Sequence, residues 1–395
     1  MPSSRDAVIV GGARTPFARL NGALAPLPAA ALGGAAIAGA LARAGVPAED
    51  VDAVVMGHVV QAGCGQNPAR QAAIAAGIGW DVPTVTVNKV CLSGLAAVTD
   101  AARQIRLGEA EVVVAGGQES MSLAPHLLPG SRQGWTYGDV PAADSLARDG
   151  LTDAFDGQSM GASTEARNAV LGIDRQAQDE VAAASHQRAA AAQRDGVFDA
   201  EIVPVDVPQR RGTATVAADE GVRPDTTAET LAGLRPAFAA EGTITAGNSS
   251  PLSDGAAALV VVSRTYAETH GLRILATVGA AGQVAGPDTS LHSQPSRAIE
   301  AALDKAGWAV GELDFIEINE AFGAVAVQSL KDLGYPLDRT NIHGGAIALG
   351  HPIGASGARL ALHAALELDR RGAGRAAVSL CGGGGQGEAL LLFRE

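Results

Sequence analysis

The chain has 395 residues, of which 47% are hydrophobic and only 3% aromatic, and it contains 50 glycines. Its formal net charge of −13 argues against a nucleic-acid partner, because nucleic-acid binding depends on lysine and arginine neutralising phosphates. No apolar run approaches the roughly 18 residues that span a bilayer, so no membrane partner is expected. Three cysteines make no disulfide framework, which suits a reducing compartment, and we expect a cytoplasmic protein of two or three domains.

Two distant segments of the chain share one pattern. Residues 36–59 ("AIAGALARAGVPAEDVDAVVMGHV") align without gaps with residues 298–321 ("AIEAALDKAGWAVGELDFIEINEA"). In each, apolar residues at helical spacing end in Ala-Gly, which is typical of a helix terminus, and an apolar strand follows. Residues 91–117 resemble residues 354–383 more loosely. The alternative is a chance likeness of alanine-rich helices, but the repetition predicts two similar α/β domains, with mixed, mostly parallel sheets covered by helices.

Between the copies lies a segment of different composition, with a stretch that contains Trp and Tyr and another that is rich in turn residues. We interpret it as an inserted loop domain of residues 119–250 that covers the cleft between the copies. The predicted N-terminal half comprises residues 1–118 plus 251–272, and the C-terminal half comprises residues 273–395.

The first chemically distinctive element is the junction "TVTVNKVCLSGLAAV", where Cys91 follows a predicted strand and opens a predicted helix. The N-terminus of a helix favours anions, so we expect a thiolate there to be stabilised and the thiol pKa to be lowered. The sharp strand-to-helix turn resembles a nucleophile elbow. The alternative is that Cys91 is a small buried hydrophobe.

Three later segments place polar groups at predicted strand ends. Asn319 and Glu320 follow an apolar strand, where Asn319 could instead be an ordinary helix N-cap. His351 lies in the glycine-rich "GGAIALGHPIGASGAR", and it could be the base that activates a thiol. Cys381 ends the strand "AAVSL". Ligands of open α/β sheets bind beyond the carboxyl ends of the strands, so we expect these side chains and Cys91 to meet.

The C-terminal "CGGGGQG" contains a formal G-x-G-x-x-G pattern, but only eight residues follow Gly387. These are too few for the helix and the acidic residue of a dinucleotide site, which excludes that interpretation. Four consecutive glycines indicate instead a backbone that turns tightly or approaches a ligand with its N–H groups exposed.

Together these segments resemble the thiolase family over nearly the whole chain. The matching motifs, in chain order, are "NKVCLSG", "GNSSPLSDGAAA", "INEAFGAVAV", "GGAIALGHPIGASG" and "CGGGGQG". Related ketoacyl synthases share the fold, but they typically have two histidines where this chain has Asn319 and His351. The pattern is most similar to biosynthetic thiolases, which are acetyl-CoA acetyltransferases and reversibly condense two acetyl-CoA molecules to acetoacetyl-CoA and CoA.

The resemblance implies a role for each candidate catalytic residue. His351 would take the proton from Cys91, whose thiolate attacks the acetyl thioester and leaves an acetyl-enzyme, which implies ping-pong kinetics. Cys381 would remove a proton from the methyl group of the second acetyl-CoA. His351 and a water held by Asn319 would stabilise the enolate oxygen, and the N–H groups of Cys91 and Gly383 would form a second oxyanion hole.

The resemblance also implies where CoA binds, against the inserted domain. Arg223 and Thr230 would lie near its nucleotide portion, and Phe238, Ala246 and Ser250 would line the pantetheine channel.

The chain departs from the family pattern in "DGQSMGAS", where Ser159 precedes Met160 and Gly161 and many biosynthetic members have a histidine. Because this position approaches the acyl end of the substrate, the departure leaves the acyl chain length open.

Two alternatives remain: a degradative 3-ketoacyl-CoA thiolase that acts on longer chains, and, more remotely, a non-catalytic acyl-CoA or lipid-binding relative. We expect no metal and no cofactor, since CoA thioesters are the substrates. The resemblance implies a homo-oligomer, a dimer or a tetramer, with residues 125–139 as a candidate contact loop. The direction, the pathway and any redox regulation of the Cys91–Cys381 pair stay open.

Overall fold

The computed structural model describes residues 4–395 and contains a mixed sheet of ten strands in the order β12-β13-β14-β11-β1-β10-β5-β3-β4, with β2 paired to β10. The strands are β1 (Ala7–Arg14), β2 (Ala18–Arg19), β3 (Ala53–Gly57), β4 (Thr84–Val87), β5 (Val112–Ser120), β10 (Ser253–Ser263), β11 (Ala276–Ala285), β12 (Phe315–Ile318), β13 (Gly374–Gly382) and β14 (Gln386–Arg394). Two short pairs lie apart, β6 (His126–Leu127) with β7 (Ala143–Asp144), and β8 (Val205–Pro208) with β9 (Thr213–Val216).

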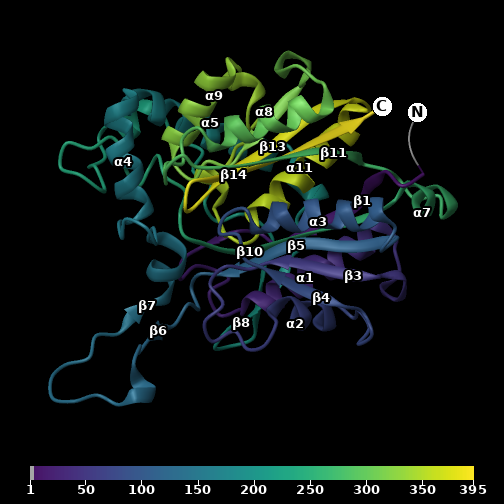
Figure 1. Cartoon of the computed structure of the whole chain (residues 1–395), viewed down its shortest axis with the longest axis horizontal. Helices are drawn as coiled ribbons and strands as arrows, with labels where there is room; N and C mark the ends of the chain where they lie inside the picture. Colours follow the sequence, from purple (N-terminus) through teal and green to yellow (C-terminus); the bar gives the residue numbers. More distant parts are fainter. Residues whose placement is uncertain (1–3) are drawn as a thin grey trace.

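The helices arrange the sheet into layers (Figure 1). They are α1 (Ala29–Ala44), α2 (Pro68–Ala75), α3 (Ser93–Leu107), α4 (Met160–Leu171), α5 (Arg175–Arg194), α6 (Ala228–Ala232), α7 (Arg264–Thr269), α8 (Gln294–Ala306), α9 (Gly323–Leu333), α10 (Ala346–Leu349) and α11 (Ser356–Arg371). Helices α8 and α9 lie outside β11–β14, α1 and α2 lie outside β1–β5, and α3 and α11 lie between the two sets of strands. No helix in residues 4–395 is long and apolar enough to cross a membrane.

The two halves of the sheet repeat one pattern, which confirms the predicted duplicated α/β fold. β1, β10, β5 and β3 follow in the same order as β11, β14, β13 and β12. The pairs β3–β5 and β12–β13 are parallel, as expected for strands joined through a helix, and β3–β4 is parallel too. Strands β10 and β14 run antiparallel to both neighbours, so antiparallel pairing has a larger share than we expected. No crossover helix precedes β14, which returns directly after β13 as a hairpin.

The central layer is built from small side chains that let α3 and α11 approach closely. A Cβ atom on Gly357 would lie 2.4 Å from the backbone nitrogen of Leu95, and one on Gly94 would lie 2.8 Å from that of Ala358. Real Cβ atoms do not reach such distances, so both crossing positions require glycine. This contact brings the N-terminal ends of the two helices together, and each end follows a predicted site residue.

The segment between β5 and β10 is spread over the molecule: α4, β6 and β7 lie at one side, whereas β8 packs with α1 and α2 (Figure 1). It contains α4, α5, α6 and both short strand pairs, and residues 126–144, which we call the arm, project away from the layers. The predicted domain boundaries stay a prediction.

Candidate active site

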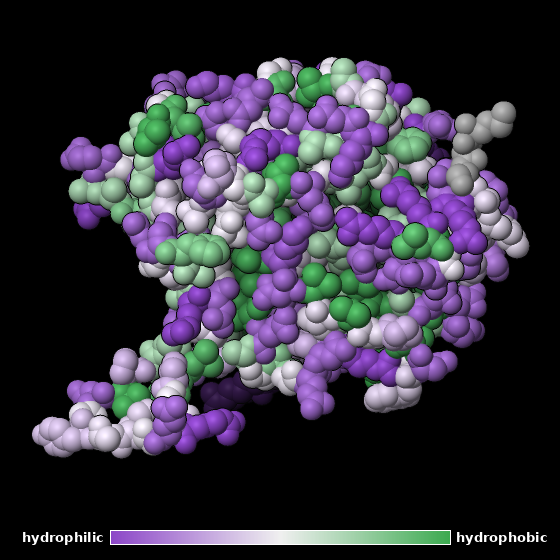
Figure 2. Space-filling view, viewed as in Figure 1, coloured by the Kyte–Doolittle hydropathy of each residue, from purple (hydrophilic) through white to green (hydrophobic). Residues whose placement is uncertain are grey.

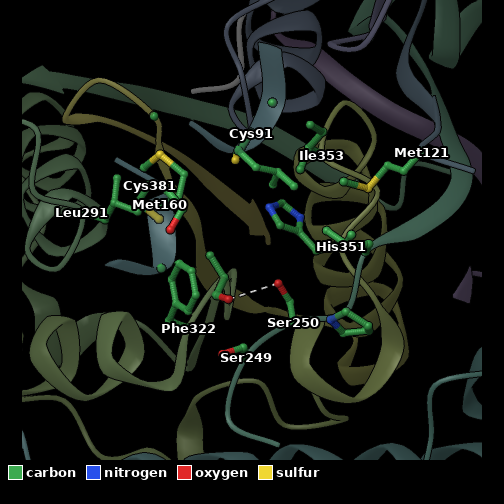
Figure 3. A pocket seen from close by; sticks show the side chains of 18 of the residues that line it. Cys91, Met121, Met160, Ser249, Ser250, Leu291, Phe322, His351, Ile353 and Cys381 are labelled. Atoms are coloured by element: carbon green, nitrogen blue, oxygen red, sulfur yellow. Dashed lines mark hydrogen bonds between the residues drawn. The ribbon is translucent and has the colours of Figure 1, made fainter. Parts of the chain in front are cut away.

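A cavity of about 550 Å³ lies where the helix ends, the strand ends and the inserted segment meet (Figure 3). Its lining includes most of the residues singled out in the sequence: Cys91, Ser159, Met160, Arg223, Phe238, Ala246, Ser250, His351, Cys381 and Gly383. The side chains of Cys91, His351 and Cys381 turn toward one space, although they come from three distant segments. The structure therefore brings Cys91, His351 and Cys381 together, whereas Asn319 and Glu320 are not part of the lining.

Residues 88–92, the Cys91 turn, connect β4 to α3. Val90 has a φ of +51°, a left-handed conformation that is strained for a β-branched residue. Local hydrogen bonds hold it: Asn88 Oδ1 accepts from the Val90 N–H at 3.0 Å, and Ser93 Oγ donates to the Val90 carbonyl at 2.6 Å. The strain at Val90 therefore belongs to a turn that directs the next side chain, Cys91, into the cavity.

The surroundings of the Cys91 sulfur favour the neutral thiol, although the residue as a whole is half-buried. Burial raises its pKa to about 12, although hydrogen bonds from the N–H groups of Cys91 and Gly383 act in the opposite direction, and the charge of Glu119 raises it further. The expectation that the helix terminus lowers this pKa is therefore wrong, because desolvation outweighs the backbone N–H groups. Those two N–H groups nevertheless point at the sulfur, where they could also stabilise an oxyanion on a bound acyl group.

His351 is held as a neutral imidazole with a defined tautomer. Burial lowers its pKa to about 4. The Ser356 hydroxyl lies 3.0 Å from the Pro352 carbonyl and 2.6 Å from Nδ1 of His351. We assign its one hydrogen to the carbonyl, and with that assignment the hydroxyl accepts from Nδ1–H of His351. Nε2 is then the nitrogen without a hydrogen, and Asn319 Nδ2 lies 3.3 Å from it. An imidazole in this state can accept a proton.

Asn319 does not cap a helix. The next helix, α9, begins at Gly323 with Phe322 at its N-cap, which leaves the Asn319 amide free to contact His351. The neighbouring Glu320 has a structural role. Its carboxylate accepts from Ser185 Oγ at 2.7 Å, from Asn341 Nδ2 at 2.7 Å and from the Ile347 N–H at 3.0 Å.

Residues 350–355, the His351 loop, are anchored by a second carboxylate. Glu119 at the end of β5 accepts from the Gly354 N–H at 2.9 Å and from the Val59 and Val60 N–H groups at 3.1 Å. The imidazole of His58 lies 3.3 Å from the same carboxylate. The loop that positions His351 is therefore fixed at one end by Glu320 through α10 and at the other by Glu119.

Cys381 lies on the other side of the cavity, near the end of β13, where it packs with Met160, Leu291 and Phe322. Burial raises its pKa, and a thiolate at Cys91, which lines the same cavity, would raise it further. Four glycines follow Cys381, and Gly384 and Gly385 have positive φ in the turn between β13 and β14. This hairpin leaves no room for a dinucleotide-binding helix, and it exposes the Gly383 N–H toward Cys91.

The residues predicted to contact CoA divide into two groups. Arg223, Phe238, Ala246 and Ser250 line the cavity together with Ser159 and Met160, and Ser159 also caps α4 by accepting from the Ala162 N–H at 3.2 Å. Thr230 lies outside the lining, exposed at the start of α6, where it forms a capping box with Thr227. Among residues 4–395, no group of three or more His, Cys, Asp or Glu side chains is arranged to hold a metal ion.

Sequence reasoning missed several residues of the site. The cavity is also lined by Arg19, Met121, Leu151, Leu252, Leu291 and Ile353. All but Arg19 are apolar residues without a chemical signature of their own, and Arg19 stands in no motif that singles it out. Ser356 also belongs to the site, since its hydroxyl contacts Nδ1 of His351. Its position five residues after His351, across a proline and a glycine, was the available signal.

Two family models match the chain almost end to end. One described as the thiolase N-terminal domain matches residues 7–265, and one described as the thiolase C-terminal domain matches residues 272–394. A probable acetyl-CoA acetyltransferase of Mycolicibacterium smegmatis is 58% identical over 388 residues, which cover 98% of this chain and all of the relative. The acetyl-CoA acetyltransferase of Cupriavidus necator is 48% identical over 391 residues, with 99% of this chain and 100% of the relative covered.

A solved structure shows the same similarity. The crystal structure of the Bacillus anthracis acetyl-CoA acetyltransferase superposes with a TM-score of 0.94 at 39% identity, and the match covers 98% of both chains.

Proposed function

The chain belongs to the thiolase family, and from this premise we propose that it is an acetyl-CoA C-acetyltransferase, which reversibly condenses two acetyl-CoA molecules to acetoacetyl-CoA and CoA. The observation that supports this most is the shared cavity of two thiols and one neutral imidazole, next to two backbone N–H groups. The chemistry needs these groups, since one thiol must hold an acyl group while another removes a proton.

In the first half-reaction, Nε2 of His351 takes the Cys91 proton as the sulfur attacks the thioester carbonyl. The carbonyl oxygen becomes an oxyanion, which the N–H groups of Cys91 and Gly383 stabilise. The bond from the carbonyl carbon to the CoA sulfur then breaks, and Cys381 gives its proton to the departing CoA thiolate. The products are acetyl-Cys91, free CoA, protonated His351 and a Cys381 thiolate.

In the second half-reaction, the Cys381 thiolate removes a methyl proton from a new acetyl-CoA. Because burial raises the Cys381 pKa, its thiolate is a stronger base than an exposed one, as this weak carbon acid requires. The enolate carbon attacks acetyl-Cys91, a carbon–carbon bond forms and the Cys91–carbonyl bond breaks. Protonated His351 returns its proton to Cys91, so every group regains its starting state.

CoA would enter along the inserted segment. Arg223 and Arg19 line the same cavity as the thiols and supply positive charge for phosphates on a chain whose net charge is −13. Phe238 packs edge to face against Phe322, with 6.2 Å between the ring centroids, and gives the channel an apolar wall for pantetheine. We propose that Thr230 contacts CoA at the outer end. We propose no metal and no cofactor besides the CoA thioester substrates.

The test of the reaction is mass spectrometry after mixing with acetyl-CoA. We expect one acetyl adduct on Cys91, its loss in Cys91→Ser, and its retention in Cys381→Ser together with impaired condensation. An acetyl adduct that persists on the Cys91→Ser protein would refute the assignment. A protein that binds CoA esters but never forms an acyl-enzyme would instead be the non-catalytic relative.

The test of the substrate is a thiolysis assay with 3-ketoacyl-CoA of increasing chain length. We expect acetoacetyl-CoA to give the highest kcat/KM. A strong preference for long chains would identify a degradative thiolase, since Ser159 occupies less of the cavity than a histidine would.

We also propose that the protein is a cytoplasmic homo-oligomer whose contacts include the arm. Leu128, Trp135 and Tyr137 are exposed on it, and it stands away from the rest of the molecule (Figure 2). Large apolar side chains on such an extension fit a contact with another copy of the chain. Replacing residues 126–144 by a short Gly-Ser linker should lower the mass measured by light scattering, and an unchanged mass would exclude the arm as a contact.

A further inference from the structure

A buried ion pair joins the Cys91 turn to the strand that pairs with the Cys381 strand. Lys89 Nζ donates to Glu388 Oε2 at 2.6 Å, and the Glu388 side chain is fully buried while that of Lys89 is 26% exposed. The second carboxylate oxygen accepts from Thr99 Oγ1 and Gln283 Nε2, each at 3.2 Å. A buried carboxylate needs such partners, because an unpaired charge in the interior is costly.

One end of this pair is attached to the strained turn. Lys89 immediately precedes Val90, whose φ of +51° is strained, and lies two residues before Cys91. Its backbone N–H donates to Ser93 Oγ at 2.8 Å, so Lys89 is tied to the start of α3 by its backbone and to β14 by its side chain.

The other end is attached to the Cys381 hairpin (β13, its turn and β14). Glu388 lies opposite Leu380 in the β13–β14 register, one pair before Cys381 opposite Gly387. The Glu388 carbonyl also accepts from Ser379 Oγ at 2.9 Å. A shift of Glu388 would therefore move the backbone that places Cys381 and Gly383.

We propose that the Lys89–Glu388 ion pair is a positioning device that sets the distance between the N–H groups of Cys91 and Gly383, and so completes the oxyanion hole from two segments almost 300 residues apart in the sequence. This inference rests on the proposed function. Neither side chain lines the cavity, so both act through the backbone groups that they hold and neither contacts the substrate.

The test compares two reactions of the same sulfur. Acetylation of Cys91 by acetyl-CoA passes through a tetrahedral oxyanion, whereas alkylation by iodoacetamide displaces iodide and forms no oxyanion. A change in folding, exposure or basicity of the thiol alters both rates, including a change in basicity that comes from the N–H groups of Cys91 and Gly383. Loss of oxyanion stabilisation lowers the acetylation rate in addition, and the ratio of the two rates isolates that part. The readout is therefore the ratio of the acetylation rate constant to the alkylation rate constant, followed by peptide mass spectrometry.

We expect Lys89→Met to lower this ratio by at least about tenfold, because misplaced oxyanion-hole donors cost about that much or more. Lys89→Arg keeps a cation and should restore the ratio to within about threefold. Glu388→Gln should lower the ratio about as much as Lys89→Met. In the double variant the ratio should fall by less than the product of the two single fold-changes, because both single variants break the same interaction.

The matched control is Arg394→Met. Arg394 lies at the far end of β14, is 25% exposed and pairs with Asp369 at 3.3 Å, so its loss should lower the thermal midpoint and leave the ratio unchanged. An unchanged ratio in both Lys89→Met and Glu388→Gln would overturn the proposal, and Glu388→Gln decides alone if Lys89→Met does not fold. A wild-type protein that is alkylated at Cys91 but never acetylated would instead refute the proposed function.

Discussion

Ser356 Oγ lies 2.6 Å from Nδ1 of His351 and 3.0 Å from the Pro352 carbonyl, so with its hydrogen assigned to that carbonyl it holds the imidazole in one tautomer. Ser356→Ala removes this acceptor, so we expect kcat to fall about tenfold or more while KM stays within about twofold, since general acid–base catalysis depends on the correct tautomer. Ser356→Thr should retain most of the activity. Steady-state thiolysis assays check this.

The control for that variant is Ser329→Ala, which removes another fully buried hydroxyl, one that donates to the His292 carbonyl at 2.8 Å. Equal losses of kcat in Ser329→Ala and Ser356→Ala would contradict a role in the tautomer.

The high pKa of Cys91 predicts how its alkylation depends on pH. A thiol with a pKa of about 12 is almost fully protonated at neutral pH, and the thiolate fraction rises about tenfold per pH unit below that value. The rate of iodoacetamide labelling at Cys91 should therefore rise steadily from pH 7 to pH 9.5. A plateau below pH 8 would show instead a thiolate–imidazolium pair. Peptide mapping separates Cys91 from the half-buried Cys64.

The crossing of α3 and α11 predicts a combined loss of stability and acylation. In Gly357→Ala, the new Cβ would meet the Leu95 nitrogen at 2.4 Å and would push the helices apart, which costs about 1–3 kcal/mol of unfolding free energy. Cys91 and His351 lie at the ends of these helices, so the acetylation rate should fall with the thermal midpoint. At Gly311 a Cβ atom would meet no other atom within 4 Å, so Gly311→Ala should change neither quantity.

Four buried histidines predict acid sensitivity. His58 is not one of them, because desolvation by burial is outweighed by its contacts with Cys64 and Glu119, which raise its pKa to about 9. Burial lowers the pKa to about 4 in the four, namely His186, His292, His343 and His351. Their folded pKa lies below the unfolded value of about 6.5, so the unfolded state binds more protons as the pH falls from 6.5 toward 4. The unfolding free energy should therefore decrease in this window, by up to about 1.4 kcal/mol per pH unit for each group.

His292→Gln tests this, since it removes one such group. The drop in thermal midpoint between pH 7.5 and pH 5.0 should be smaller than in the wild type. His270→Gln, a change of an exposed histidine outside the arm, should leave that drop unaltered. A wild-type midpoint that does not decrease between these pH values would contradict the argument.

The sequence was informative wherever reactive side chains follow strand ends. A repeated α/β pattern directs such positions to one edge of the sheet, and this predicts that Cys91, His351 and Cys381 lie close together. The sequence was uninformative where a property of a side chain, such as its pKa, depends on how deeply the fold buries that side chain. The rise of the Cys91 pKa follows from desolvation by segments hundreds of residues away, and no local pattern contains that information.

The same reason explains the missed lining residues. In the sequence, Leu252 and Ile353 are ordinary apolar residues, and only the fold shows that they line the cavity beside the inserted segment. The larger share of antiparallel pairing had a different cause, because the pattern of strand and helix does not say which strands return directly to a neighbour.

The equivalent helices of the two repeats, α3 and α11, cross at Gly94 and Gly357, yet Cys91 lies two residues before one helix and His351 five residues before the other. Two identical chains that crossed in this way would set like side chains against each other. Because both repeats belong to one polypeptide, the two opposed turns can carry different groups, an acyl carrier on one side and its base on the other.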